Sequence, residues 1–449
     1  MLLRKVVGRI DKPPRLFQDL FLRHFLVRVF DDKVQYLKAS HSAMAKTKSN
    51  NTGNKHGKMA NASSKQSPEQ LYASAIELVE QSQPEEALKK AQELWLAVQN
   101  RSATEALPAL NLLGEICVEL GEVDAAKSYF EQAAVLDPDG ALEGPLGGGA
   151  EKFLWLAQLN EEGGKQSVAW FERGANALQR EITALESGQA VGLDEESLLL
   201  MRVEKKRKLA NALCGIVEVY MTDLSWEDDA EARCENLITQ ALTIEEETSP
   251  EILQTLASVR LSQERKEDAQ SALKRSIATW SALDPEDPAV PDFATRISLS
   301  RLLMEAEMES EAMDVLERLV LEDDQSVEAQ YLGGWCQKLI ADKREFALAN
   351  GTNKEMTEDE QKQNLEAILK GSRRWLQTSL KLYKLVDYED DRLKQHSEEL
   401  VAGLDKLLGP EKEGADEHED EWEDEWEGIE DDEDAQAAAE DEDQEMKDS

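Results

Sequence analysis

One stretch of this sequence, from Leu110 to Pro138, constrains the fold more than any other. In its first half, four small or apolar residues recur three to four positions apart and so share one face of a helix: Leu110, Leu113, Gly114 and Cys117. After Gly121, which interrupts this helix, a second stripe follows at similar spacing: Ala126, Phe130 and Ala133. The second helix ends at Pro138 because proline cannot continue a helix. The stretch therefore predicts a hairpin of two antiparallel helices.

The order of residues in this hairpin resembles a tetratricopeptide (TPR) repeat, a helix pair of about 34 residues that stacks on further copies of itself. The pattern is Leu-x-x-Leu-Gly-x-x-Cys, then Ala-x-x-x-Phe-x-x-Ala, then Pro. Leu110 stands where the family often has tryptophan, and Cys117 where it has tyrosine. An ordinary amphipathic hairpin is the alternative, and repetition elsewhere in the chain favours the repeat.

The same two stripes recur along most of the chain. A first hairpin begins at Ser67 and Pro68, a serine cap followed by proline at the first helical position. Further stripes lie in residues 153–173, 209–250, 253–285, 299–319 and from 329 onward, where a polar insertion at 345–361 displaces the second helix to 369–379. A last helix from Asp390 to Leu408 would cap the stack, with Leu407 in its apolar stripe. The sequence predicts an all-α fold, a right-handed superhelical solenoid of about seven TPR-like hairpins with a capping helix.

The junction between the second and third hairpins is the least regular part of this pattern. Ala169 and Arg173 are predicted to continue the second stripe of the third hairpin, although this requires an insertion relative to the repeat period. The glycine-rich residues 140–149 lack the strand, lysine and Ser/Thr of a phosphate-binding loop, and are interpreted as a linker.

Composition divides the chain into three parts. Residues 1–66 contain 14 Lys or Arg and four Asp or Glu, and are expected to be a disordered basic arm. Residues 1–43 are interpreted as the product of a mis-called start codon, with a mitochondrial transit segment as the alternative. Residues 67–409 are predicted to form the superhelical domain. Residues 410–449 contain 22 Asp or Glu and two lysines, which predicts a disordered acidic tail.

The net charge of −42 favours a basic partner and argues against direct binding to nucleic acid, because a phosphate backbone would add like charge. No apolar run of roughly 18 residues indicates a membrane span. The four cysteines are far apart and are expected to be core thiols in a reducing compartment. No metal site, cofactor or fingerprint of a hydrolase, nucleotide-binding protein or dehydrogenase is indicated, so we do not expect an enzyme.

The working surface of such a solenoid is its concave groove, lined by first-helix residues that face away from the packing stripe. The predicted binding residues are Glu69, Tyr72, Glu80, Asn111, Glu115, Glu119, Glu151, Gln158, Glu161, Glu162, Asn211, Glu218, Glu251, Gln254 and Glu305. Few basic residues oppose them: Lys208, Arg301 and Lys338. The groove is therefore predicted to be acidic, although a chain of this composition has acidic surfaces on every side. In the tail, Trp422 and Trp426 would share one face if that segment became helical on binding.

The hairpins, the polar segment from Met44 and the acidic tail with Trp-Glu-Asp-Glu-Trp together resemble the fungal family of dedicated assembly chaperones of large-ribosomal-subunit protein four. The resemblance covers residues 67–449, and the basic residues 1–43 are not expected in that family. It implies a chaperone that binds the basic internal loop of this ribosomal protein. It also implies movement between cytoplasm and nucleus, with a nuclear import receptor and the pre-ribosome as further partners. The alternatives are a TPR scaffold or chaperone for another basic client, such as histones, and a TPR adaptor without charge preference.

Overall fold

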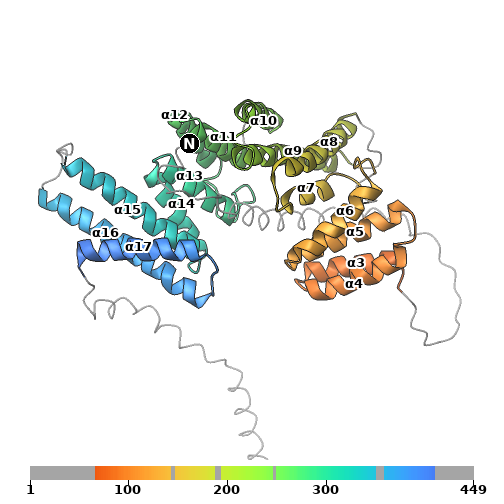
Figure 1. The fold of residues 1–449 in the computed structure, drawn as a ribbon, viewed down its shortest axis with the longest axis horizontal. Helices are drawn as coiled ribbons and strands as arrows, with labels where there is room; N and C mark the ends of the chain where they lie inside the picture. The colour runs from red at the N-terminus through yellow and green to blue at the C-terminus, as the bar shows by residue number, and fades with distance from the viewer. Residues whose placement is uncertain (1–65, 143–146, 188–193, 246–248, 350–357, 410–449) are drawn as a thin grey trace, which may run out of the picture. The chain divides into compact units, whose positions relative to one another are not determined.

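The computed structural model describes residues 66–142, 147–187, 194–245, 249–349 and 358–409 (Figure 1). These residues form fifteen helices and no strand, which confirms the predicted all-α fold. The chain divides into two compact units between Glu322 and Asp323. None of the described helices is both long and apolar enough to cross a membrane.

The first unit contains six helix hairpins in sequence order. Their helices are α3 (Pro68–Glu80), α4 (Pro84–Val98), α5 (Ala103–Glu119), α6 (Val123–Leu136), α7 (Glu151–Gln158), α8 (Gly164–Glu186), α9 (Glu195–Met221), α10 (Ala230–Ile244), α11 (Pro250–Ser262), α12 (Lys266–Ala278), α13 (Phe293–Glu305) and α14 (Glu309–Glu322). The two helices of each hairpin lie side by side, and α4 to α9 also pack in sequence order on the helix that follows (Figure 1).

Helix α3 begins where the sequence predicts. The Ser67 hydroxyl accepts a hydrogen bond from Gln70 N at 3.3 Å, and the Gln70 side-chain oxygen accepts one from Ser67 N at 3.0 Å. This reciprocal pair satisfies two of the backbone N–H groups that the start of a helix leaves unpaired. The stack of hairpins therefore has a capped first helix.

Helices α5 and α6 form the hairpin on which the prediction rests. Phe130 of α6 is fully buried, and a Cβ atom added to Gly114 of α5 would lie 2.6 Å from its ring. Gly121 ends α5 with φ at +74°, a conformation that glycine adopts without steric cost. Helix α5 begins at Ala103, earlier than the stripe at Leu110 indicates, because the cap formed by Ser102 and Glu105 starts it there.

The third hairpin departs from the predicted register. Helix α7 is only eight residues long, and Gly163 and Gly164, both with φ of 62°, form the turn before α8. The buried stripe of α8 starts at Ser167 and continues through Phe171, whereas Ala169 is exposed. The prediction that Ala169 lies in the packing stripe is wrong, because the position that corresponds to Ala126 is taken by Ser167.

The second unit contains α15 (Val327–Ala349), α16 (Glu358–Leu385) and α17 (Asp391–Leu408). The polar insertion predicted at 345–361 is shorter than expected, because α15 continues to Ala349 and α16 starts at Glu358. Helix α17 packs on both other helices and begins after a cap by Asp390, within one residue of the predicted start. Its buried residues include Leu393 and Leu404, but Leu407 is 61% exposed, so the assignment of Leu407 to the stripe is wrong.

Candidate functional site

The structure separates the predicted binding residues by their exposure. Exposed residues are Glu69, Glu80, Glu119, Glu161, Glu162 and Glu305. Half-buried residues are Tyr72, Glu151, Gln158, Asn211, Glu218 and Glu251. Buried residues are Asn111, Glu115 and Gln254, which have little surface to offer a partner. Glu161 and Glu162 lie in the turn after α7 and not on the first helix, because α7 ends at Gln158.

On α5, the chain's own glycine-rich segment packs against the helix at Pro108 and Asn111. The Asn111 side-chain N–H₂ group donates a hydrogen bond to Gly147 O at 2.8 Å. A Cβ atom on Gly147 would lie 2.7 Å from the backbone nitrogen of Pro108, so the backbones approach closely. The interpretation of this segment as a linker is wrong for its described residues, 140–142 and 147–149, because they pack against helices.

A buried ion pair fixes the two ends of the same segment. Lys152 Nζ lies 2.9 Å from Asp137 Oδ2, and the two side chains are 1% and 4% exposed. Lys152 also donates to Gly149 O at 2.9 Å, while the Asp137 carboxylate accepts from Ala141 N at 2.9 Å. These hydrogen bonds offset the cost of removing both charges from water.

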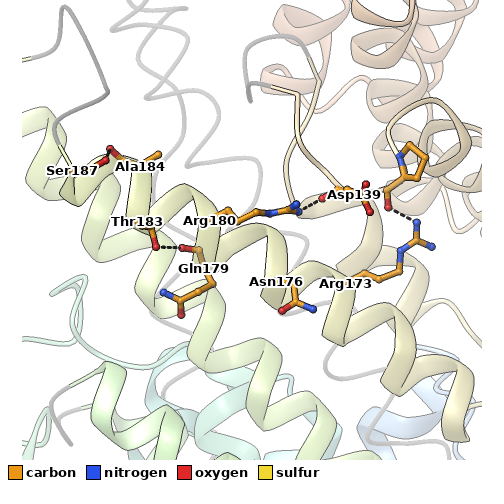
Figure 2. Close-up of a pocket in the computed structure, with 9 residues that line it drawn as sticks. Asp139, Arg173, Asn176, Gln179, Arg180, Thr183, Ala184 and Ser187 are labelled. Atoms are coloured by element: carbon orange, nitrogen blue, oxygen red, sulfur yellow. Dashed lines mark hydrogen bonds between the residues drawn. The ribbon is translucent and has the colours of Figure 1, made fainter.

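A hollow of about 620 Å³ lies between α8 and the two residues just before this segment, Pro138 and Asp139 (Figure 2). Arg173 and Arg180 reach from α8 and donate to the carbonyl oxygens of Pro138 and Asp139. The Arg173 guanidinium also lies 4.6 Å from the ring centres of both Phe153 and Trp170. The hollow is therefore lined with cationic groups that hold the chain's own loop, which does not suit a basic ligand.

An ion-pair cluster joins α7, α8 and α9 and neutralises one of the predicted residues. Lys205 Nζ lies 2.8 Å from a carboxylate oxygen of Glu181, and Glu151 lies 3.5 Å from Lys205 and from Lys208. Burial acts to lower the pKa of Lys205, but the carboxylates of Glu151 and Glu181 outweigh it and hold that pKa above its ordinary value. Glu151 therefore holds helices together and is not a free acidic group.

Three other predicted carboxylates whose pKa is raised by burial lie near the C-terminal ends of first helices and have no ion-pair partner among the described residues. Glu119 and Glu305 are the last residues of α5 and α13, and Glu218 lies three residues before the end of α9. Burial raises the pKa of Glu218 to about 7. Burial also raises the pKa of Glu305 and, together with Glu85, that of Glu119, although both residues keep more than a third of their surface exposed.

A carboxylate at this end of a helix meets the negative end of the helix dipole, which a cation would offset. Glu119, Glu218 and Glu305, which we call the helix-end carboxylates, are therefore suited to receive lysine or arginine side chains.

Other chemistry finds little support in the described residues. No group of three or more His, Cys, Asp or Glu is placed to hold a metal ion there. All four cysteines are buried free thiols, as predicted, and burial raises the pKa of Cys117 and of Cys234 to about 11. Thiols with such a raised pKa are poor nucleophiles.

Comparison with known proteins shows the family of this chain. The tetratricopeptide repeat family model matches residues 107–139. A protein of Emericella nidulans described as a probable assembly chaperone of rpl4 is 46% identical over 399 residues, which is 88% of this chain and 97% of the relative. A protein of Schizosaccharomyces pombe with the same description is 34% identical over 313 residues, 69% of this chain and 84% of the relative. The chain belongs to this family of probable assembly chaperones.

A solved structure supports this assignment. The assembly chaperone of RpL4 (Acl4), residues 1–338, is 50% identical and superposes with a TM-score of 0.58 over 63% of this chain and 99% of that structure. The resemblance noted from the sequence is therefore confirmed. Trp422 and Trp426 of the predicted tail site lie outside the described residues.

Two features were missed by the sequence interpretation. The run Lys205-Lys206-Arg207-Lys208 on α9 is the source of the cations that neutralise Glu151, and it was visible as a basic cluster in an acidic chain. Trp226, in the turn between α9 and α10, is 73% exposed. Its exposure had no sequence signal, since tryptophan is highly buried on average.

Proposed function

We propose that this protein is a dedicated assembly chaperone whose client is the ribosomal protein rpl4 of the large subunit. The observation that carries the proposal is the 46% identity to a relative described as a probable assembly chaperone of rpl4. The match covers 97% of the relative's length. The chain acts by binding and shielding this basic client and not as an enzyme. It accompanies the client from the cytoplasm into the nucleus, with an import receptor, and releases it at the pre-ribosome.

The charge of the chain supports the proposal. A basic ribosomal protein aggregates or binds stray RNA until its charge is covered, and a chain with net charge −42 can cover it with many charge-assisted contacts. The helix-end carboxylates supply contacts of this kind, because each lacks an internal cation among the described residues and gains one from the client. The predicted target is the basic internal loop of the client.

The test is binding of the purified full-length chain to purified rpl4 and, in parallel, to core histones. We expect a stoichiometric complex with rpl4 that weakens steeply as salt rises from 50 to 500 mM, and weaker binding to histones. Preferential binding to histones would show that the client is another basic protein and not rpl4. Binding that does not change with salt would show that charge-assisted contacts do not hold the client.

A matched pair of variants tests the carboxylates. The triple change Glu119→Gln, Glu218→Gln and Glu305→Gln should weaken rpl4 binding about 10- to 100-fold, since each charge-assisted contact contributes about 0.5 to 1 kcal/mol at a partly exposed site. The control changes three exposed acids on second helices, Glu131→Gln, Glu267→Gln and Glu317→Gln, and alters the net charge by the same amount. Equal losses in both variants would show that only total charge matters.

A further inference from the structure

The turn between α9 and α10 presents an exposed tryptophan. Trp226 is 73% exposed, whereas the indole of Trp155 or Trp280 is almost fully buried. A single exposed leucine is unremarkable on a protein surface, but tryptophan buries the most apolar area of any side chain and is enriched where proteins bind one another. The exposure of Trp226 therefore calls for a physical reason.

The turn that carries Trp226 is held in place on both sides of it. On one side, Leu224 is 4% exposed, and the Asp223 carboxylate accepts a hydrogen bond from Gly164 N at the start of α8 at 2.9 Å. On the other side, Glu227 forms an ion pair of 2.8 Å with Lys165, also on α8. A Cβ atom on Gly163 would lie 1.9 Å from the Asp223 carboxylate, so glycine is required for this approach.

Backbone hydrogen bonds close the same turn. Leu224 N donates to Val219 O at 2.9 Å, and Glu227 N donates to Leu224 O at 3.0 Å. The indole is thus projected from a fixed backbone and not from a loose loop. A partner that packs on it loses little conformational entropy, because the backbone is already ordered before binding.

The charge around the indole selects the partner. Asp223, Glu227, Asp228 and Asp229 lie within three residues of Trp226. Glu227 is matched by Lys165, and Asp229 by Arg233 at 2.6 Å, but no ion pair involves exposed Asp228 within the described residues. Asp228 is two residues from Trp226. An indole face and an unmatched carboxylate both attract cations, since both are negative.

We infer that the turn at residues 222–229 is a further contact for the cationic client, in which an arginine or lysine of the client stacks on the indole of Trp226 and pairs with Asp228. This contact differs in type from those of the helix-end carboxylates, because it combines apolar area with charge. The inference rests on the proposed function, since the client is the source of the cation.

The test compares Trp226→Ala, Trp226→Phe and Leu96→Ala for binding of the full chain to purified rpl4. Leu96 is 70% exposed on α4 and serves as a control for loss of exposed apolar area. We expect Trp226→Ala to weaken binding about 5- to 30-fold, Trp226→Phe to recover most of it, and Leu96→Ala to change it less than twofold. Asp228→Asn should weaken binding about two- to fivefold at low salt and have no effect at high salt.

The outcomes separate the two proposals. If the unmodified chain binds rpl4 and Trp226→Ala binds equally well, the inference about the turn is wrong while the proposed function stands. If the unmodified chain does not bind rpl4, the proposed function fails first. If Trp226→Ala instead converts a dimer to a monomer in light scattering, the indole packs on a second copy of this chain, which also overturns the inference.

Discussion

The hairpin α5–α6 and the region α7–α9 bury a phenylalanine against a glycine in the same way, but they hold their neighbours differently. In the hairpin, Phe130 packs on Gly114 of the preceding helix, and apolar side chains supply the rest of the contact. In the second region, Phe171 of α8 packs on Gly215 of the helix that follows, and the half-buried ion pair of Glu181 with Lys205 adds to the contact between α8 and α9. A regular repeat needs only the apolar stripes, whereas an irregular junction also needs charged groups that fix one geometry.

The largest expected effect comes from breaking the buried ion pair. Lys152→Ala should reduce the free energy of unfolding by about 3 to 5 kcal/mol, because it leaves the Asp137 carboxylate buried without its cation. Urea unfolding followed by circular dichroism measures this. Lys165→Ala is the control, because its ion pair with Glu227 involves a side chain that is 74% exposed, and we expect a change below about 0.5 kcal/mol. Similar losses in both variants would mean that α7 does not depend on the buried pair.

The second prediction concerns what the two regions share. A Cβ atom would lie 2.6 Å from the Phe130 ring in Gly114→Ala and 2.7 Å from the Phe171 ring in Gly215→Ala. Overpacking costs about 1 to 3 kcal/mol and the better helix propensity of alanine returns about 1 kcal/mol, so each variant should lose up to about 2 kcal/mol. The measurement is the free energy of unfolding.

Two companion variants sharpen this result. Gly403→Ala in α17, where a Cβ atom would meet nothing within 4 Å, should instead be neutral or stabilising by up to about 1 kcal/mol. The double variant with Gly114→Ala and Phe130→Leu should recover part of the loss, because the smaller side chain relieves the contact. No recovery would show that the glycine acts through its backbone and not through the ring.

The third prediction uses the raised pKa of Glu218 on α9. Because burial raises this pKa from its ordinary 4.5 to about 7, the folded chain binds the proton more tightly than the unfolded chain. Its contribution to stability is therefore most favourable below pH 4.5 and is lost as the pH rises to 7 and above. Relative to the unmodified chain, Glu218→Gln should gain about 1 to 3 kcal/mol in free energy of unfolding between pH 5 and pH 8.

Glu267→Gln, at an exposed position on α12, is the matched control for Glu218→Gln and should show no such trend. Client binding by the unmodified chain should depend on pH in the opposite direction to stability, because a cation binds the ionised carboxylate better than the protonated one. Binding of rpl4 should tighten as the pH rises from 6 to 8, and Glu218→Gln should flatten that rise. A pH profile that is the same in Glu218→Gln and in the unmodified chain would show that Glu218 is not desolvated.

Sequence patterns predicted α3 to α6 well because each of their helices carries its own apolar stripe and has a serine cap, a glycine or a proline near one end. They failed at α7 and α8 because α7 has only eight residues, and a stripe that starts at Ala169 is out of register with the buried Ser167 and Phe171. The binding residues were harder to predict from the sequence than the helices. Whether a carboxylate such as Glu151 is free depends on lysines more than fifty residues away, and the exposure of Trp226 depends on the burial of Leu224 beside it. Neither pairing has a local signature.

The smallest expected effect tests that register directly. Ala169 is exposed on α8, so Ala169→Lys should change the free energy of unfolding by less than about 0.5 kcal/mol, as most surface substitutions do. Ala126 has the corresponding appearance in sequence but is fully buried in α6, so Ala126→Lys should cost about 4 kcal/mol or more by forcing an ammonium group into an apolar contact. Thermal unfolding of the two variants side by side measures the difference. If Ala169→Lys is as damaging as Ala126→Lys, α8 packs in the register predicted from the sequence, with Ala169 in the buried stripe, and the contrast between the two regions disappears.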